Sequence, residues 1–150
     1  MEWLIRRTMH LYWRFSRGLT LGVRGMAVDR EGRIFLIKHS YVPGWHLPGG
    51  GVEPGETALE ALTREMMEEG NIAITQPGFF ALYFNPRDSD RDHVALYVIR
   101  DFVQTSPPQP NAEIIAHGFF ARDALPADTT PATRARIAEV LDGVEARERW

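Results

Sequence analysis

The sequence predicts a mixed α/β fold in which helices cover both faces of a β-sheet. Three observations support this fold class. Apolar runs of strand length recur along the chain, helix-forming segments alternate with them, and 150 residues with 44% apolar composition suit one globular domain. No internal repeat or low-complexity segment divides the chain. We therefore expect a single domain over residues 19–150, preceded by a helix over residues 1–18.

The first strands are expected at residues 21–28 and 33–38, two apolar runs separated by the sequence Asp29-Arg-Glu-Gly32. Because the glycine supplies a positive φ in such a turn, the two runs are predicted to pair as a hairpin. Further strands are expected at residues 79–84 and 93–103, on either side of a polar, turn-forming segment. A short strand is expected near residues 114–120.

Two helices are predicted within the domain. The first begins at Thr57 and continues through strong helix formers to Gly70. The second begins at Thr130, an N-cap hydroxyl followed by proline at the first helical position. Its apolar residues recur on one face that is expected to pack on the domain: Ile137, Val140, Leu141 and Val144.

Three carboxylates share one face of the first of these helices. At 100° per residue, Glu65, Glu68 and Glu69 fall within an arc of about 100°. A separate apolar stripe is expected to face the core: Leu59, Leu62 and Met66. Like charges at this spacing repel, and acids are unfavourable near a helix C-terminus. A divalent cation would relieve the repulsion, because Mg²⁺ prefers carboxylate oxygens; the alternative is a solvated acidic face.

The segment before this helix is rich in glycine. It reads Trp45-His-Leu-Pro-Gly-Gly-Gly-Val-Glu-Pro-Gly-Glu56, in which Gly49 to Gly51 allow close approach of the backbone to a ligand. Within it, Glu53-Pro-Gly-Glu56 places proline and glycine where a type II turn requires them. Alone, such a run is equally compatible with a plain loop.

Residues 50–72 read G-G-V-E-P-G-E-T-A-L-E-A-L-T-R-E-M-M-E-E-G-N-I and resemble the Nudix box, G-x5-E-x7-R-E-U-x-E-E-x-G-U with U a bulky apolar residue. The matching positions are Gly50, Glu56, Arg64, Glu65, Met66, Glu68, Glu69 and Ile72. One position departs, because Asn71 stands where the family has glycine. Asparagine tolerates the left-handed conformation; otherwise Gly70 would close the helix one residue early. The resemblance extends over residues 20–145 and implies a Nudix-like α/β/α sandwich.

The resemblance also implies an activity: hydrolysis of a nucleoside diphosphate linked to another moiety, with Mg²⁺ or Mn²⁺ as cofactor. The implied metal ligands are Glu65, Glu69, Glu68 and the Gly50 carbonyl. Arg64 is then expected to orient a glutamate, and Glu56 to hold Arg64 in place. Both residues can equally brace the loop against the helix.

The base that accepts a proton from the attacking water stays open among Glu69, Glu65 and Glu113, in that order. Glu113 is also compatible with a surface carboxylate at the start of a strand. The candidate substrate contacts are aromatic or imidazole side chains: Tyr41, Trp45, His46 and Tyr83. Because aromatic residues in strands most often belong to the core, a core position is the alternative for each of them. Nucleotide sugars, ADP-ribose and nucleoside triphosphates all remain candidate substrates.

Composition excludes several classes of function. The chain has no cysteine, so thiolate metal sites, disulfides and cysteine nucleophiles are excluded. Residues 1–24 carry five arginines and one glutamate, a charge of +4, which leaves −7 for the rest of a chain whose total is −3. A body so acidic is a poor general nucleic-acid binder. We expect a cytoplasmic protein, either free or peripheral at a membrane surface.

The predicted helix over residues 1–18 is amphipathic and basic. Its basic residues fall within an arc of about 100°, and its apolar residues fill the opposite arc of about 200°. The apolar side can pack on its own domain or on a second subunit as a homodimer, or it can lie in an anionic membrane surface. Two rivals to an enzyme follow from these observations: a non-catalytic nucleotide-binding module of the same fold, and a membrane-surface adaptor that depends on this helix.

Overall fold

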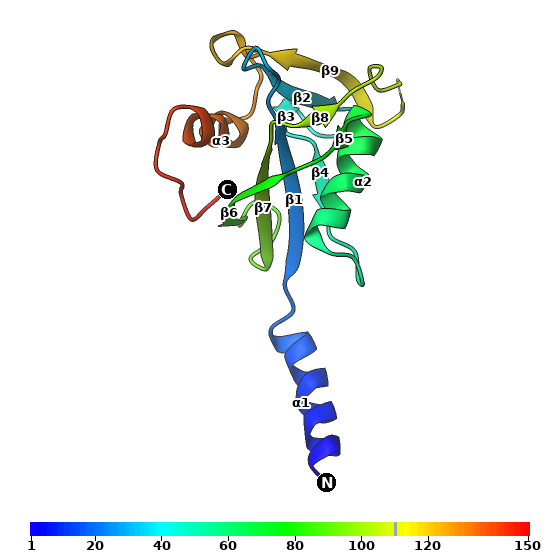
Figure 1. Cartoon of the computed structure of the whole chain (residues 1–150). Helices are drawn as coiled ribbons and strands as arrows, with labels where there is room; N and C mark the ends of the chain where they lie inside the picture. The colour runs from blue at the N-terminus through cyan, green and yellow to red at the C-terminus, as the bar shows by residue number, and fades with distance from the viewer. Residues whose placement is uncertain (110) are drawn as a thin grey trace.

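The computed structural model describes residues 1–109 and 111–150 of the chain (Figure 1). Its helices are α1 (Glu2–Ser16), α2 (Ala58–Gly70) and α3 (Pro131–Leu141), with a 3-10 turn at Arg122–Ala124. Its strands are β1 (Thr20–Ala27), β2 (Ile34–His39), β3 (Trp45–His46), β4 (Gly49–Gly51), β5 (Ala73–Ile74), β6 (Gly78–Phe84), β7 (Asp92–Ile99), β8 (Phe102–Val103) and β9 (Ile114–Phe120).

The strands form a mixed four-stranded sheet and smaller antiparallel sheets. In the larger sheet the order is β4-β1-β7-β6. Strand β1 runs parallel to β7, whereas the pairs β1–β4 and β6–β7 are antiparallel. A three-stranded sheet has the order β3-β2-β9, and β5 pairs with β8. Helix α2 lies on one side of these strands and α3 on the other (Figure 1).

Alternate residues of the central strands serve opposite layers of this sandwich. On β1, Val23 is buried in a cluster with Leu62 of α2, whereas Met26 is buried in a second cluster with Ile137 of α3. Strands β2 and β7 alternate in the same way, which explains why they read as continuous apolar runs. The α/β/α sandwich expected from the sequence is thus confirmed.

The predicted hairpin of the first two strands is wrong. The Asp29–Gly32 turn forms, with a positive φ of 77° at Gly32, but only an isolated bridge between Val28 and Ile34 follows it. Strand β1 is already paired on both edges, with β4 and β7, so no edge is left for β2. The two strands therefore lie in different sheets, and both contribute side chains to the same two core clusters.

Other boundaries also differ from the expectation. The run 93–103 forms two strands, because the chain turns at Asp101, whose carbonyl accepts from the Thr75 amide, and β8 then pairs with β5. Leu59 is 49% exposed instead of buried, although its neighbour Ala58 packs against the core cluster that includes Leu62 and Met66. Val144 is also 49% exposed, because α3 ends at Leu141.

Both ends of α2 are closed by side-chain or backbone caps, which fix where its carboxylates lie. At the start, Thr57 and Glu60 form a capping box, with 3.2 Å from the Glu60 amide to Thr57 Oγ1 and 2.8 Å from the Thr57 amide to Glu60 Oε2. At the end, Asn71 adopts the left-handed conformation with φ 49° and ψ 39°. The helix thus runs through Gly70, and it is Asn71 that takes the role of the family's glycine.

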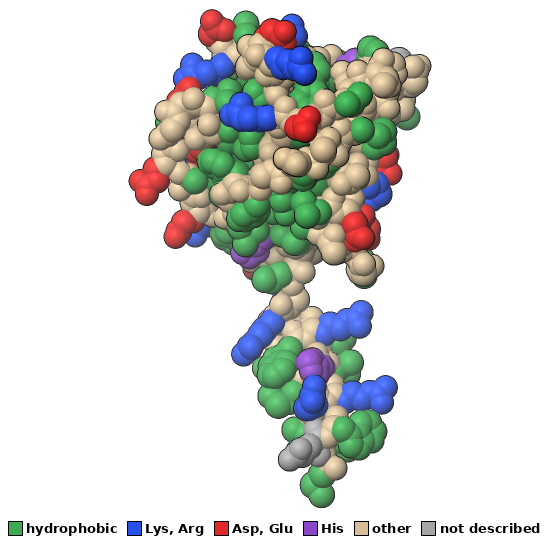
Figure 2. Space-filling view, in the orientation of Figure 1, with side chains coloured by type: hydrophobic (Ala, Val, Ile, Leu, Met, Phe, Trp, Pro, Cys, Tyr) green, Lys and Arg blue, Asp and Glu red, His purple; other side chains and the backbone are tan. Residues whose placement is uncertain are grey.

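Helix α1 forms as predicted but stands away from the sandwich (Figures 1 and 2). Its large apolar side chains are exposed, by 73% for Phe15 and 60% for Leu11. Arg91 bridges the base of α1 to the domain by donating from Nη1 to the Phe15 carbonyl at 3.1 Å. Of the alternatives considered for the apolar side, packing on its own domain is therefore not what this structure shows.

Among the described residues, no helix is both long and apolar enough to span a lipid bilayer.

Candidate functional site

A cleft of about 780 Å³ lies where β4 meets the C-terminal half of α2. Its walls also include the start of β1, the segment after β2 and the loop between β6 and β7. The lining residues discussed below are Arg24, His39, Tyr41, His46, Gly49, Gly50, Gly51, Glu65, Glu68, Glu69, Arg87 and Glu113. The three carboxylates predicted to share a helix face therefore do meet one cavity, opposite the three glycines.

The Glu65 carboxylate lies directly against the backbone of Gly50. A Cβ placed on Gly50 would fall well inside the contact distance of both Glu65 carboxylate oxygens. Gly50 pairs with Val23 of β1, so the backbone that flanks Glu65 is held by the sheet. A side chain at residue 50 would therefore displace the Glu65 carboxylate from its place against the strand.

Glu69 is the most enclosed carboxylate of the cleft. Its Oε2 accepts a hydrogen bond of 2.7 Å from the Gly49 amide, and its Oε1 lies 3.7 Å from Nε2 of His39. Burial raises the pKa of Glu69 to about 7, although the Gly49 amide and the positive charge of Arg24 act in the opposite direction. Gly49 itself has a φ of 148° and no space for a Cβ beside Val23.

Arg64 connects the glycine-rich loop to the acidic face of α2. Its Nε and Nη2 donate to the two oxygens of Glu56 at 2.9 and 3.1 Å, and Nη1 donates to Glu65 Oε1 at 2.6 Å. Nη2 also donates to the Gly51 carbonyl at 3.2 Å. Glu68 is 61% exposed at the side chain and lies 3.6 Å from Arg64 Nη1. The hydrogen bonds from Arg64 lower the pKa of Glu56, which keeps it ionised.

Glu56 is positioned by the turn before α2. The Glu56 amide donates to the Glu53 carbonyl at 3.0 Å, and Gly55 has a φ of 86°. These features agree with the type II turn expected at Glu53–Glu56.

Glu113 approaches the cleft from a distant part of the sequence. Its backbone carbonyl accepts from the Ser40 amide at 2.8 Å, which ties the start of β9 to the segment after β2. The charge of Glu113 contributes to raising the pKa of Glu69, so the two carboxylates share one electrostatic environment. The exposed side chain of Glu113 faces the cleft across from α2.

Two of the four expected substrate contacts line the cleft and two do not. Tyr41 is 68% exposed there, and His46 accompanies it, with Nε2 2.9 Å from the Pro43 carbonyl. Trp45 instead packs against Phe120 on the α3 side, because neighbouring residues of a strand point to opposite faces. Tyr83 is fully buried and is likewise removed from the candidates.

The Tyr83 hydroxyl has a structural partner that explains its position. It donates to Glu139 Oε2 of α3 at 2.7 Å, and the Arg136 guanidinium lies 4.2 Å from its ring centroid. Burial and this hydrogen bond raise the pKa of Tyr83. The residue thus joins β6 to α3 on the face of the sheet opposite α2.

Sequence reasoning missed two residues beside the carboxylates. Arg24 donates from Nη1 to the carbonyls of Leu47 and Gly49 at 3.0 and 3.2 Å, and so fixes the loop that holds Glu69. His39 ends β2 and is 8% exposed, and burial lowers its pKa. The signal for Arg24 was a lone cation inside an apolar strand; no local pattern marked His39.

The donor set suits a hard divalent cation. The oxygens of Glu65, Glu68 and Glu69 face one cavity, and Gly50 leaves the space that a Cβ would otherwise fill beside Glu65. Carboxylates and carbonyls are the ligands that Mg²⁺ and Mn²⁺ prefer. Among the described residues, no group of three or more His, Asp or Glu side chains is arranged so that it could hold a metal ion by itself. Phosphate oxygens and water would then complete the coordination, as is common for Mg²⁺.

Comparison with known proteins identifies the region that contains the cleft. Residues 18–141 match the family model described as the NUDIX domain. Among solved structures, a MutT NUDIX hydrolase from Burkholderia pseudomallei is similar over 81% of this chain and 97% of its own. The TM-score is 0.69 at 30% sequence identity.

Two curated relatives match over shorter stretches. A putative 8-oxo-dGTP diphosphatase of Bacillus subtilis (strain 168) is 36% identical over 50% of this chain and 50% of its own length. An ADP-ribose pyrophosphatase of Methanocaldococcus jannaschii is 36% identical over 45% of this chain and 41% of its own length. The chain thus spans about half the length of these two relatives or less.

Proposed function

This chain belongs to the Nudix family, and on that premise we propose that it hydrolyses the pyrophosphate bond of a nucleoside diphosphate derivative with Mg²⁺ or Mn²⁺. One observation carries the proposal: Glu65, Glu68 and Glu69 line a single cleft together with residues 49–51, whose backbone Glu65 and Glu69 contact directly. This arrangement presents several anionic oxygens beside a backbone that allows close approach. Such a surface suits cations that in turn accept phosphate oxygens.

In the proposed reaction, the oxygen of a water molecule bonds to one phosphorus, and the bond from that phosphorus to the bridging oxygen breaks. The electron pair leaves with the second phosphate, and a carboxylate accepts the proton of the water. Glu65, Glu69 and Glu68, with the Gly50 carbonyl, would hold the cation. Bound there, the cation would neutralise phosphate charge and lower the pKa of water.

Arg64 acts on the carboxylates and not on the substrate in this proposal. Two nitrogens of its guanidinium, Nε and Nη2, donate hydrogen bonds to Glu56, and the third nitrogen, Nη1, orients Glu65. A planar guanidinium suits this task because several of its donors lie in one fixed plane. The glycine-rich loop and α2 are thereby kept at a fixed separation, as cation binding requires.

The proton acceptor is proposed in the order Glu69, Glu65 and Glu113. Glu69 combines burial with a fixed orientation, because the Gly49 amide holds one of its oxygens. Glu113 is exposed and comes from the opposite wall. Because the proton acceptor must reach the attacking water, the kinetics of the separate variants distinguishes these carboxylates.

The substrate is proposed to be of the nucleoside triphosphate, ADP-ribose or nucleotide-sugar type. The first two types agree with the names of the similar Bacillus subtilis and Methanocaldococcus jannaschii proteins. Tyr41 and His46 are the side chains from the predicted set that can contact it, and Arg87 adds a cation to the same cleft.

The test is a screen of nucleotide derivatives with Mg²⁺ or Mn²⁺, in which wild type is compared with Glu69→Gln. We expect kcat to fall roughly a hundredfold or more, because loss of a metal-binding or proton-accepting carboxylate removes a catalytic contribution of that order. Glu145→Gln is the matched control, since Glu145 is exposed and lies outside the cleft.

Binding measured beside turnover separates the enzyme from the non-catalytic module. Nucleotide binding without hydrolysis in the wild type would favour the module. Hydrolysis that Glu69→Gln leaves unchanged would remove Glu69 from the proposed machinery.

A further inference from the structure

The apolar side of α1 has no partner among the described residues. The side chains that line it are exposed by 43% to 73%, namely Leu4, Ile5, Met9, Leu11, Tyr12 and Phe15. Figure 2 shows hydrophobic side chains, in green, on the helix that extends away from the sandwich. Arg91 fixes the base of the helix through the carbonyls of Phe15 and Gly18, at 3.1 and 3.4 Å. The contact is to the backbone, so it leaves the apolar side free to meet another surface.

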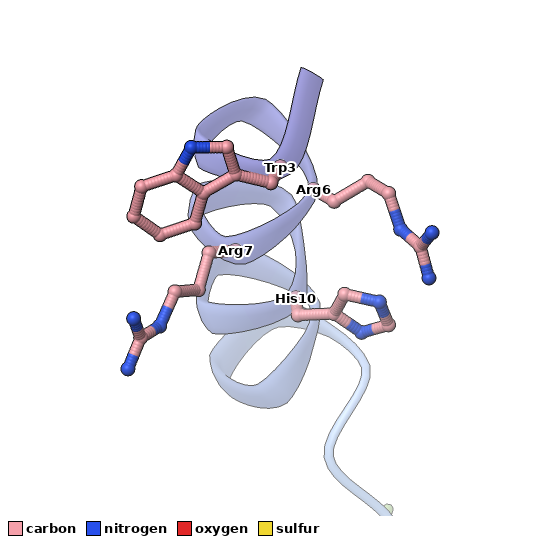
Figure 3. A pocket seen from close by; sticks show the side chains of 4 residues that line it. All are labelled: Trp3, Arg6, Arg7 and His10. Atoms are coloured by element: carbon pink, nitrogen blue, oxygen red, sulfur yellow. The ribbon is translucent and has the colours of Figure 1, made fainter. Parts of the chain in front are cut away.

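The opposite side of α1 is a basic stripe, formed by Arg6, Arg7, His10, Arg14 and Arg17. These residues fall within an arc of about 100° around the helix. Figure 3 shows Trp3 and Arg7 on one flank of the helix, and Arg6 and His10 on the other.

Aromatic rings lie beside the basic stripe. The Arg7 guanidinium lies 5.9 Å from the Trp3 ring, and that of Arg17 lies 5.6 Å from the ring of Trp13. The helix thus pairs cations with rings that suit the boundary between water and hydrocarbon.

We propose that α1 binds the surface of an anionic lipid membrane and lies in its plane, with the apolar side toward the acyl chains. Charge complementarity supports this occupant: residues 1–18 carry four arginines and one glutamate, a charge of +3, which leaves −6 for the rest of the chain. The acidic domain would be repelled by an anionic surface, so α1 must supply the attraction. Helices with a basic face and a wide apolar face bind such surfaces without crossing them.

The shape of the apolar side favours a membrane over a second copy of the chain. The six side chains span an arc of about 160°, and Trp13 extends it to about 200°, whereas a paired helix contacts a narrow seam of about two residues in seven. The surface of a membrane can cover this wider arc, because the helix lies partly embedded in it. Moreover, 15 residues make a helix only about 22 Å long, too short to reach the roughly 1,200 Å² of a stable protein interface by helix pairing alone.

Membrane binding by α1 would also orient the cleft. Thr20 and Leu21 follow α1 after a short connection and already line the cleft. The hydrogen bonds from Arg91 hold the base of the helix to the domain at this point. The cleft therefore lies on the domain near its attachment to the membrane-bound helix.

The test measures partition of the full chain onto vesicles of phosphatidylglycerol and phosphatidylcholine, compared with vesicles of phosphatidylcholine alone. We expect preferential binding to the anionic vesicles, and weaker binding as salt screens the charges. Leu11→Glu should reduce the partition coefficient at least tenfold. Ile115→Glu is its matched control, because both side chains are 60% exposed and Ile115 lies on β9.

A second pair of variants tests the basic stripe. The double substitution Arg6→Gln and Arg14→Gln should weaken binding to anionic vesicles at least tenfold, whereas Arg30→Gln with Arg100→Gln, on exposed positions of the domain, should not. All four variants should retain the wild-type Tm, since none alters a buried side chain.

Three outcomes would overturn the proposal. The first is no partition of the wild type onto anionic vesicles, and the second is equal partition by Leu11→Glu. The third is a lipid-free dimer, detected by sedimentation velocity, that Leu11→Glu dissociates, because the apolar side would then be covered by a second copy. Each readout is independent of hydrolysis, so the proposal can fail while the proposed activity stands.

Discussion

Arg64 holds Glu56 with two hydrogen bonds, of 2.9 and 3.1 Å, and with its remaining nitrogen holds Glu65 at 2.6 Å. One side chain thereby sets the distance between the glycine-rich loop and the acidic face of α2. The ion pair contributes more to the geometry of the site than to the stability of the fold, because Arg64 is about one-third exposed and solvent weakens the attraction.

Arg64→Lys should therefore impair activity more than folding. The charge remains, but lysine cannot form the two parallel bonds to Glu56, so we expect kcat to fall about tenfold or more while Tm changes by a few degrees at most. Arg33→Lys is the control, since Arg33 also bonds a carboxylate, Asp29 at 2.8 Å, away from the cleft. Unchanged kcat for Arg64→Lys would show that the fork is not needed.

Gly50→Ala should displace Glu65, because the new Cβ would overlap its carboxylate. We expect weaker Mg²⁺ or Mn²⁺ activation, seen as a higher metal concentration at half-maximal rate and a lower kcat. Gly51→Ala is the matched control one residue away, where a Cβ would meet nothing within 4 Å. Equal metal dependence of the two variants would contradict the proposed position of Glu65.

The stability of the metal-free protein should fall as pH rises from about 4.5 to about 7. Burial raises the pKa of Glu69 to about 7 from the ordinary 4.5, so within this window the folded state binds more protons than the unfolded state. Arg24 opposes this shift, and Glu65 and Glu113 add to it. His39 acts in the other direction, because burial lowers its pKa.

The contribution of Glu69 is isolated by comparing wild type with Glu69→Gln in the presence of a chelator. The free energy of unfolding, followed by urea titration at several pH values, should decline less steeply with rising pH in the variant. Addition of Mg²⁺ near pH 8 should stabilise the wild type more than the variant. Parallel pH profiles would show that Glu69 titrates in the fold as it does when unfolded.

Asn71→Ala should destabilise the protein by about 1–2 kcal/mol, because alanine is strained in the left-handed conformation at φ 49°. The substitution also removes the Asn71 Nδ2 hydrogen bonds to the carbonyl and hydroxyl of Ser106, at 3.0 and 2.9 Å. Asn71→Gly should cost less than about 1 kcal/mol, since glycine relieves the strain while losing the same bonds. Chemical denaturation measures both; equal losses would mean that the bonds to Ser106, not the backbone, determine the effect.

Local patterns predicted much of the carboxylate cluster. Glu65, Glu68 and Glu69 share a face because the spacing of residues along a helix fixes their angles, wherever the helix packs. The turn at Glu53–Glu56 and the left-handed Asn71 follow from backbone preferences of neighbouring residues. Such features depend on chain geometry over a few residues, so sequence alone suffices.

The second wall of the cleft could not be predicted in this way. Arg24, His39 and Glu113 come from β1, β2 and the start of β9, and they meet only because these strands are arranged around α2. The same arrangement sends Trp45 and Tyr83 to the α3 side, although each resembled a substrate contact in the sequence. Strand alternation gives two faces but does not say which one meets the cleft.

The sequence by itself determined the acidic face of α2, the glycine-rich loop that precedes it and the amphipathic character of α1, because each is a periodicity or backbone preference within one segment. Only the tertiary structure decided that β1 and β2 separate into different sheets, and that α1 leaves its apolar side exposed. Those outcomes depend on which strand edges and apolar surfaces find partners elsewhere in the chain. That competition is settled by the whole fold and not by any one segment.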